Sequence, residues 1–182
     1  GRAHIKDSLP DVNKIYGGFN KTLNFIDNHD MERFCAIGNR VQLEQTLVFI
    51  MTLPGIPVIY YGTEQEFKSV RGSMFKEGFG SNGTDNFNQD SVMYKFIKEF
   101  AELRKSDKIF SRGEVKVLKS NSKGSGVFIY ELSYEGRRAV IVMNSSDEAV
   151  YSGKVKMEGA NNGTLKFKKG ISEEENIRVE NG

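Results

Sequence analysis

Residues 22–30 read Thr-Leu-Asn-Phe-Ile-Asp-Asn-His-Asp, a short apolar run that ends in four polar side chains. The pattern predicts a buried strand over Thr22–Ile26. α/β folds place their chemistry at the carboxyl ends of such strands. The polar group Asn28-His29-Asp30 is therefore a candidate site, carried by the strand before it.

A helix and a second strand follow this run. From Asn39 to Leu53 the apolar residues recur on one helical face: Leu43, Leu47, Ile50 and Met51. Asn39 is a suitable N-cap, and Pro54-Gly55 ends the helix. Residues 56–61 are almost continuously apolar, which is typical of a strand that is buried on both faces in a parallel sheet. The order strand, helix, strand predicts an α/β fold.

A long loop and a second helix come next. Residues 72–88 are rich in Gly and Asn, which is typical of a loop. Apolar residues then return at helical spacing: Met93, Phe96, Ile97, Phe100 and Leu103. We expect Asp90 to cap this helix. Residues 1–112 therefore contain two strand–helix units.

After Gly113 the pattern changes to short strand-like runs that are separated by turn residues such as Asn121 and Gly136. The runs cover residues 114–118, 127–132, 138–144, 151–157, 164–168 and 176–179. Their spacing predicts a small antiparallel β-sandwich over residues 113–182. The fold class is thus α/β followed by all-β, with the domain boundary near residues 112 and 113.

Residues 25–34 (FIDNHDMERF) and residues 55–65 (GIPVIYYGTEQ) each carry a specific motif, and a helix joins them. They resemble the seventh and the eighth barrel strand of the α-amylase family, glycoside hydrolase family thirteen. The resemblance continues through Leu103-Arg104-Lys105 and into the β-sandwich, and it is closest to cyclodextrin glucanotransferases and bacterial α-amylases. It implies that residues 1–112 form the last two βα units of a (β/α)8 TIM barrel.

The resemblance also implies roles for the polar residues. The family uses an aspartate nucleophile, a glutamate acid/base and a second aspartate that stabilises the transition state, and Asp30 matches this third carboxylate. The residues that match substrate contacts lie beside Asp30 or in the next loop: Asn28, His29, Glu32, Arg33 and Arg71. The family carries its nucleophile and acid/base on strands four and five, which we expect before residue 1. We therefore expect the chain alone to be inactive.

The partner that the resemblance implies is an α-1,4-glucan or a maltooligosaccharide. Two parallel strands do not close a barrel, so we expect Thr22–Ile26 and Val58–Tyr61 to expose unpaired edges. We expect these edges to pair with a missing N-terminal barrel segment or with another copy of the chain. The Asp and Asn residues lack the spacing of a calcium loop, so we expect no metal or cofactor here and calcium only in the intact enzyme.

The composition excludes other partners. The 182 residues carry 26 Lys and Arg against 24 Asp and Glu, scattered along the chain, which argues against nucleic acid and against an anionic membrane. No stretch is long and apolar enough to cross a bilayer. The single cysteine, Cys35, fits a buried apolar filler better than a nucleophile. The chain fits either a secreted or a cytoplasmic bacterial enzyme.

Two alternative functions stay open from the sequence. The β-sandwich could be the working part of a carbohydrate-binding or assembly module, with an inert barrel remnant. The chain could also come from a non-catalytic relative that uses the scaffold for protein interaction. The intact Asn28-His29-Asp30 group argues against the latter, because an abandoned sugar site has no physical need for it. Hydrolysis, transfer and cyclisation depend on acceptor-side loops that we expect elsewhere in the parent enzyme.

Overall fold

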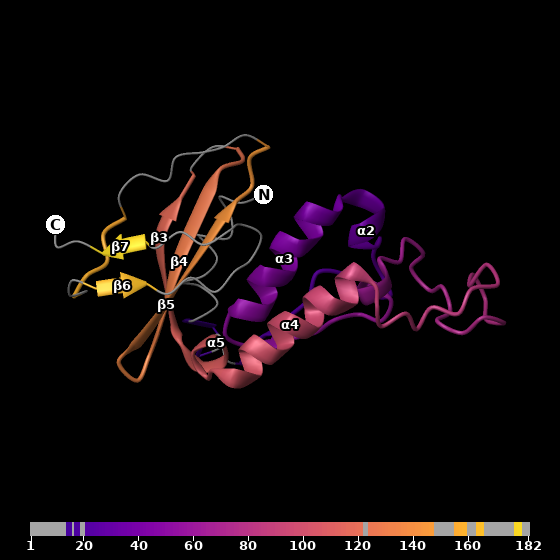
Figure 1. Cartoon of the computed structure of the whole chain (residues 1–182), viewed down its shortest axis with the longest axis horizontal. Coiled ribbons are helices and arrows are strands. Elements are labelled where there is room, and N and C mark those ends of the chain that lie inside the picture. Colours follow the sequence, from indigo (N-terminus) through magenta and orange to yellow (C-terminus); the bar gives the residue numbers. More distant parts are fainter. Residues whose placement is uncertain are drawn as a thin grey trace. The chain divides into compact units, whose positions relative to one another are not determined.

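The computed structural model describes residues 14–15, 17–18, 21–121, 124–147, 155–159, 163–165 and 177–179. The chain forms two compact units, residues 1–150 and residues 151–182. The helices of the first unit are α2 (Phe34–Ile37), α3 (Arg40–Thr52), the short 3₁₀ helix η2 (Thr63–Gln65), α4 (Val92–Ser106) and α5 (Ile109–Arg112) (Figure 1). Its strands are β1 (Leu23–Asn24), β2 (Ile56–Pro57), β3 (Glu114–Ser120), β4 (Val127–Tyr134) and β5 (Arg137–Asn144).

Strands β1 and β2 pair in parallel, as the α/β order predicts, with Leu23 opposite Ile56. They are shorter than predicted, because the ladder ends at Asn24 and Pro57, and the chain bends at Ile26. The prediction that the second strand is buried on both faces is wrong for this chain, since Ile56 is 55% exposed. Among the described residues, no third strand pairs with β1 or β2. Leu23–Asn24 and Ile56–Pro57 are thus edge strands within the described ranges, whereas Val58–Tyr61, for which the sequence predicts an exposed edge, forms no strand.

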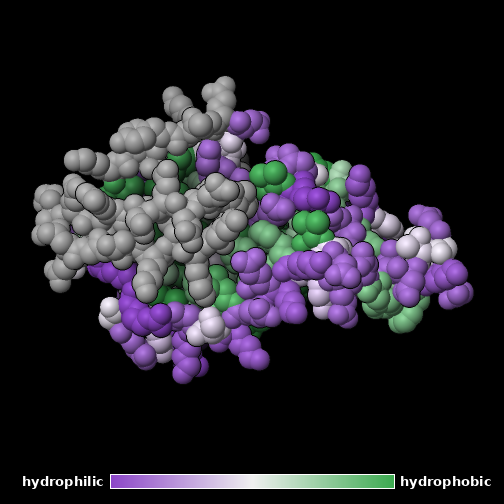
Figure 2. All heavy atoms as spheres, viewed as in Figure 1, coloured by the Kyte–Doolittle hydropathy of each residue, from purple (hydrophilic) through white to green (hydrophobic). Residues whose placement is uncertain are grey.

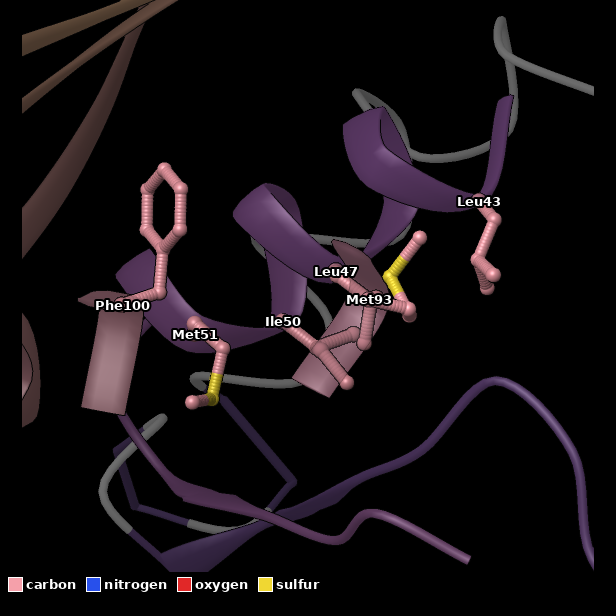
Figure 3. Packing of buried hydrophobic residues seen from close by; sticks show 6 residues of the cluster. All are labelled: Leu43, Leu47, Ile50, Met51, Met93 and Phe100. Carbon is pink, nitrogen blue, oxygen red and sulfur yellow. The ribbon is translucent and has the colours of Figure 1, made fainter. Parts of the chain in front are cut away.

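Helices α3 and α4 lie side by side and enclose the first core of the unit (Figure 1). The buried side chains come from one face of each helix: Leu43, Leu47, Ile50 and Met51 from α3, and Met93 and Phe100 from α4 (Figure 3). Ile26 and Ile59, which lie next to the paired strands in sequence, pack against the same cluster. Burial of these apolar faces holds the two helices over the parallel pair.

The ends of the two helices test the predicted caps. Asn39 caps α3 as predicted, because its side chain accepts a hydrogen bond from Gln42 N while the Gln42 side chain accepts one from Asn39 N. The cap predicted for α4 is wrong by one residue. Ser91 is the N-cap, and its Oγ accepts a hydrogen bond from Tyr94 N at 3.1 Å. Asp90 instead pairs with Lys95.

Strands β3, β4 and β5 form an antiparallel sheet in sequence order, which confirms the first three predicted strand runs. The hairpin between β4 and β5 turns at Glu135-Gly136, where both residues have positive φ (48° and 74°). Such a two-residue turn matches the twist of the strands that it joins. Leu118 lies at a bulge in β3, where the register with β4 shifts between Val117 and Lys119.

A second core lies between this sheet and helices α3 and α5. Its buried residues are Leu53, Ile109, Phe128, Tyr130, Leu132 and Ile141. The ring of Phe49 packs edge-on against Phe128 and Tyr130, with ring centroids 6.0 and 5.9 Å apart. The Tyr130 hydroxyl is hydrogen-bonded to Thr52 Oγ1, so its polar end is satisfied inside this core. Helix α3 therefore separates two apolar clusters in one compact unit.

Arg104 fastens the end of α3 to α4 and α5. Its guanidinium donates to the carbonyl oxygens of Met51 and Leu53 at 2.8 Å, to Phe110 O, and to Gly55 O. Burial lowers the pKa of Arg104 from its ordinary value. These carbonyls include groups that the last turn of α3 leaves without helical partners, so a cation is well placed there.

The second unit contains the antiparallel pair β6 (Gly163–Leu165) and β7 (Ile177–Val179). Strand β7 falls within the predicted run 176–179, and β6 overlaps the run 164–168 but begins one residue earlier. Much of the run at 151–157 lies outside the described residues. The complete β-sandwich and the boundary at residues 112 and 113 stay predictions. No helix in the part of the chain that the structure describes is long and apolar enough to span a membrane.

Candidate active-site loops

Two loops leave the carboxyl ends of β1 and β2. Backbone hydrogen bonds from Ile56 N to Thr22 O and from Val58 N to Asn24 O, both 2.8 Å long, hold the strands parallel. Because the strands are parallel, both loops begin at the same edge of the sheet. The first loop (residues 25–33) and the second loop (residues 58–71) build the candidate site.

Asp30, His29 and Arg71 meet on the outer surface of these loops. His29 Nε2 lies 3.0 Å from Asp30 Oδ2, and Arg71 Nη2 lies 3.7 Å from Asp30 Oδ1. Arg71 also donates a hydrogen bond to the His29 carbonyl oxygen at 3.3 Å. The side chains remain 61% (His29) and 68% (Asp30 and Arg71) exposed. The fold therefore brings together three predicted site residues from two separate loops and leaves them accessible.

Asn28 sets the backbone of this cluster. Its Oδ1 accepts a hydrogen bond from Asp30 N at 2.8 Å, which closes a local turn around His29. Asn28 is half-buried, whereas Glu32 is exposed on the same loop. The side-chain oxygen of Asn28 thus acts within the loop, where it fixes the position of Asp30.

A second charged cluster lies beneath the first. Asp27 is 1% exposed, and its Oδ2 accepts hydrogen bonds from Arg33 Nε and from Phe34 N, both at 2.9 Å. Its other oxygen, Oδ1, is buried without a hydrogen-bond partner among the described residues. A buried carboxylate needs a cation and good hydrogen bonds to offset its lost hydration. Arg33 supplies the cation here.

Arg33 joins the first loop to the second. Its side chain has no exposed surface; Nη1 donates to Tyr61 O and Nη2 to Thr63 Oγ1, each at 2.9 Å. Its guanidinium carbon also lies 4.5 Å from the centre of the Tyr60 ring. Thr63 Oγ1 in turn donates to Tyr60 O at 2.7 Å. The sequence predicted Arg33 as a sugar contact, but the structure places its donors on the protein.

Sequence reasoning did not single out Asp27 as a functional residue, although a signal existed. Asp27 directly follows the apolar pair Phe25-Ile26, so it stays at the level of the strand, where a carboxylate loses water and requires a cation. Arg33 is a basic residue close enough along the chain to return to it. Its partners Tyr61 and Thr63 lie 28 and 30 positions away. Only the paired strands bring them together.

Two further titratable side chains lie in or beside the loops, Cys35 and Tyr60. Burial, together with the charge of Asp27, raises the pKa of the Cys35 thiol. A raised pKa leaves little thiolate, so Cys35 behaves as an apolar filler, as the sequence predicts. Desolvation and a hydrogen bond with Tyr61 raise the pKa of the Tyr60 phenol. Neither group supplies a nucleophile.

Calcium requires several oxygen ligands around one point. In the described ranges, no three His, Cys, Asp or Glu side chains gather in a way that would hold a metal ion.

The parallel pair, its covering helices and the exposed Asp30–His29 pair at the strand ends fit an α/β enzyme that carries its chemistry at the carboxyl ends of strands. Comparison with known sequences agrees. The α-amylase catalytic domain matches residues 4–85. A cyclomaltodextrin glucanotransferase of Thermoanaerobacterium thermosulfurigenes is 34% identical over 148 residues, which cover 81% of this chain and 19% of that protein. One from Niallia circulans is 36% identical over 152 residues, covering 79% and 18%.

Solved structures give the same picture. A cyclomaltodextrin glucanotransferase with a three-domain ABC distribution superposes with a TM-score of 0.65 and 32% identity, over 79% of this chain and 29% of that one. The γ-cyclodextrin-type enzyme from alkalophilic Bacillus clarkii gives 0.66 and 30%, over 87% and 23%. The chain belongs to the α-amylase family and is similar to its cyclomaltodextrin glucanotransferases. It spans about a fifth of the length of these curated relatives.

Proposed function

We propose that the chain supplies the transition-state-stabilising carboxylate, Asp30, and part of the glucan-binding surface of a retaining enzyme that acts on α-1,4-glucans. One observation carries the proposal: Asp30, His29 and Arg71 converge at the carboxyl edge of a parallel strand pair and stay exposed. In this role residues 1–112 are the seventh and eighth βα units of a TIM barrel, and residues 113–182 are a β-sandwich.

The chemistry of the cluster suits that role. As a glycosidic bond breaks, the sugar ring develops positive charge, which a nearby carboxylate stabilises. Asp30 provides the negative charge, and His29 and Arg71 provide donors for sugar hydroxyls. Contacts that strengthen as the ring flattens lower the barrier rather than only tightening substrate binding. Asn28 holds Asp30 in place, and Glu32 is a further hydroxyl partner on the same loop.

Arg33 has a positioning role in this proposal. Its buried guanidinium connects Asp27 in the first loop with Tyr61 and Thr63 in the second. The second loop ends at Arg71, so the relative position of Asp30 and Arg71 depends on this connection. A sugar contact by Arg33 would require it to leave three hydrogen bonds.

We propose further that the 182-residue chain has no glycosidase activity by itself. A retaining mechanism needs two carboxyl groups about 5–5.5 Å apart, a nucleophile and an acid/base, besides the stabilising one. Of the other described carboxylates in the first loop, Asp27 is buried against Arg33, which leaves Glu32. Glu32 is a single carboxyl group and does not supply both a nucleophile and an acid/base.

Activity and binding together test the proposal. Incubation of the purified chain with soluble starch should release no reducing sugar, whereas calorimetric titration with maltoheptaose should show binding. The substitution Asp30→Asn should weaken that binding, because the amide lacks the charge and offers different hydrogen bonds. Starch hydrolysis that disappears in Asp30→Asn would show that the chain is a complete catalyst. A maltoheptaose affinity that is unchanged in both Asp30→Asn and His29→Ala would favour the β-sandwich as a carbohydrate-binding module.

The apolar surface of the strand pair is part of the same proposal. Leu23, Phe25, Ile56 and Val58 are 62, 48, 55 and 38% exposed. We propose that further barrel strands cover them in the working enzyme, and that copies of the isolated chain cover one another. Sedimentation velocity should show concentration-dependent association, and Ile56→Lys should reduce it. A monomer at every concentration, with β1 and β2 ordered, would contradict self-association.

A further inference from the structure

We infer that the loop formed by residues 72–88 carries an aromatic surface on which a glucan chain stacks, beyond Asp30 and Arg71. The inference rests on the proposed function and adds a binding subsite to it. Three phenylalanines of this loop are exposed: Phe75 by 68%, Phe79 by 84% and Phe87 by 50%. Large apolar side chains that gather on a surface are typical of binding sites.

The loop holds these rings in a defined arrangement. The first half of the loop, residues 72–80, begins and ends at one point, which we call the neck. A hydrogen bond from Ser73 N to Phe79 O at 2.8 Å closes it. Gly72 and Gly80 pack closely there, since a Cβ on Gly80 would lie 3.4 Å from Gly72 Cα, and Gly80 has a φ of +70°. Glycine allows both the close approach and the positive φ. The backbone that carries the rings is therefore organised before any ligand binds, which reduces the entropy cost of binding.

Further hydrogen bonds support the tip and the return of the loop. Gly78 N donates to Phe75 O at 2.9 Å, and Asn86 N donates to Met74 O at 2.8 Å. The rings of Phe75 and Phe87 then meet edge to face, with centroids 5.0 Å apart and planes at 63°. This contact brings together two parts of the loop that are separate in sequence.

The chemistry of the loop favours a sugar over an anionic membrane. A pyranose ring has an apolar C–H face and a rim of hydroxyls, which suits an aromatic ring that has polar neighbours. The exposed neighbours Asn82 and Thr84 are polar, and Asn88 is as well. The charged residues of the loop are one Lys against one Asp and one Glu, so an anionic membrane is not attracted. Figure 2 shows hydrophobic atoms interspersed with hydrophilic ones at the end of the first unit where this loop lies in Figure 1.

The surface is continuous with the proposed site. Arg71 immediately precedes the neck at Gly72 and contacts both His29 and Asp30. Phe79 lies at the same neck, because its carbonyl oxygen is bonded to Ser73 N. A glucan that is held at Asp30 and passes Arg71 therefore reaches the Phe79 ring next. Short sugars that fill only the Asp30 end do not reach it.

Titration of the 182-residue chain with maltoheptaose and with maltotriose tests the inference. Phe79→Ala should weaken maltoheptaose binding about 3- to 10-fold, the worth of one aromatic contact. Maltotriose binding should change little. Phe79→Trp should keep wild-type affinity, whereas Phe79→Leu should behave like Phe79→Ala, because leucine is apolar but has no ring face. Val142→Ala, which alters an exposed apolar residue on β5, is the matched control and should change nothing.

The outcomes separate this inference from the proposed function. Unchanged maltoheptaose binding in Phe79→Ala, together with weaker binding in Asp30→Asn, overturns the aromatic surface and leaves the proposed function standing. Wild-type affinity in Phe79→Leu also overturns it. A wild-type chain that does not bind maltoheptaose overturns both. Because Phe79 is largely exposed, unfolding of its variants would not explain a loss of binding, and equal melting temperatures should confirm this.

Discussion

The first loop carries two charged clusters that differ in burial. Asp27 and Arg33 are buried, and their hydrogen bonds all end on the protein. Asp30 and His29 are more than half exposed, and the second ionic partner of Asp30, Arg71, comes from the other loop. Asp27 and Asp30, two carboxylates of one motif, thus have different roles. The buried cluster fixes the geometry, and the exposed cluster remains available to a ligand.

The largest expected effect is on the buried cluster. Arg33→Met should destabilise the fold by about 3–5 kcal/mol, because it leaves the Asp27 carboxylate buried without its cation. Urea unfolding of the variant, followed by circular dichroism, measures this loss.

The double variant Asp27→Leu/Arg33→Met is the control. It removes both charges, so it should recover much of the stability that Arg33→Met loses. The double variant could instead lose as much stability as the single variants Asp27→Leu and Arg33→Met added together. In that case Asp27 does not depend on Arg33, and the two clusters do not differ in the way described.

Arg104 is a second buried cation whose partners are carbonyl oxygens. Arg104→Ala should cost about 2–3 kcal/mol, because it leaves carbonyls of Met51 and Leu53 unpaired at the end of α3. The exposed Lys98 of the same helix gives the matched control, since Lys98→Ala should stay within about 0.5 kcal/mol of wild type. Equal losses in the two variants would mean that charge, and not hydrogen bonding, explains the role of Arg104.

The exposed cluster should contribute little to stability. Arg71→Ala and Asp30→Asn should each change the free energy of unfolding by less than about 1 kcal/mol, because solvent screens the pair. Both should weaken maltoheptaose binding. A stability loss as large as that of Arg33→Met would remove the distinction between the clusters.

The smallest effect concerns the exposed pair of Asp90 and Lys95, whose Oδ1 and Nζ atoms lie 2.9 Å apart. The hydrogen bond and charge of Lys95 lower the pKa of Asp90 from its ordinary value of 3.8. A lowered pKa in the folded state stabilises the fold above the unfolded pKa, and this gain is lost as the pH falls through the folded value. Lys95→Ala should therefore melt slightly below wild type near neutral pH and converge with it in acid. A difference in melting temperature that grows as the pH falls would contradict the lowered pKa of Asp90.

The elements with strong local signals were predictable from sequence. Helix α3 begins after Asn39 and ends before Pro54-Gly55, because a cap and a helix breaker act on the residues next to them. At α4, Ser and Asp are both good caps, so sequence chose Asp90 where the structure uses Ser91. The hairpin at Glu135-Gly136 followed from its turn residues.

The buried half of the site was not predictable in the same way. The role of Arg33 depends on Tyr61 and Thr63, which only tertiary contacts bring near it. The lengths of β1 and β2 depend on neighbouring strands, because a ladder extends only where a partner runs beside it. Sequence identified the polar motif around Asp30, but not which of its charges would be buried.

A residue-resolved NMR titration of the chain with maltoheptaose tests the central claim most directly. The account predicts the largest shifts at Asn28, His29, Asp30 and Arg71, with further shifts in the loop of residues 72–88. Asp27 and Arg33 should shift less, since they lie beneath the surface. Shifts confined to strands β3, β4 and β5, with the Asp30 loop unchanged, would contradict the assignment of a glucan site to the strand ends.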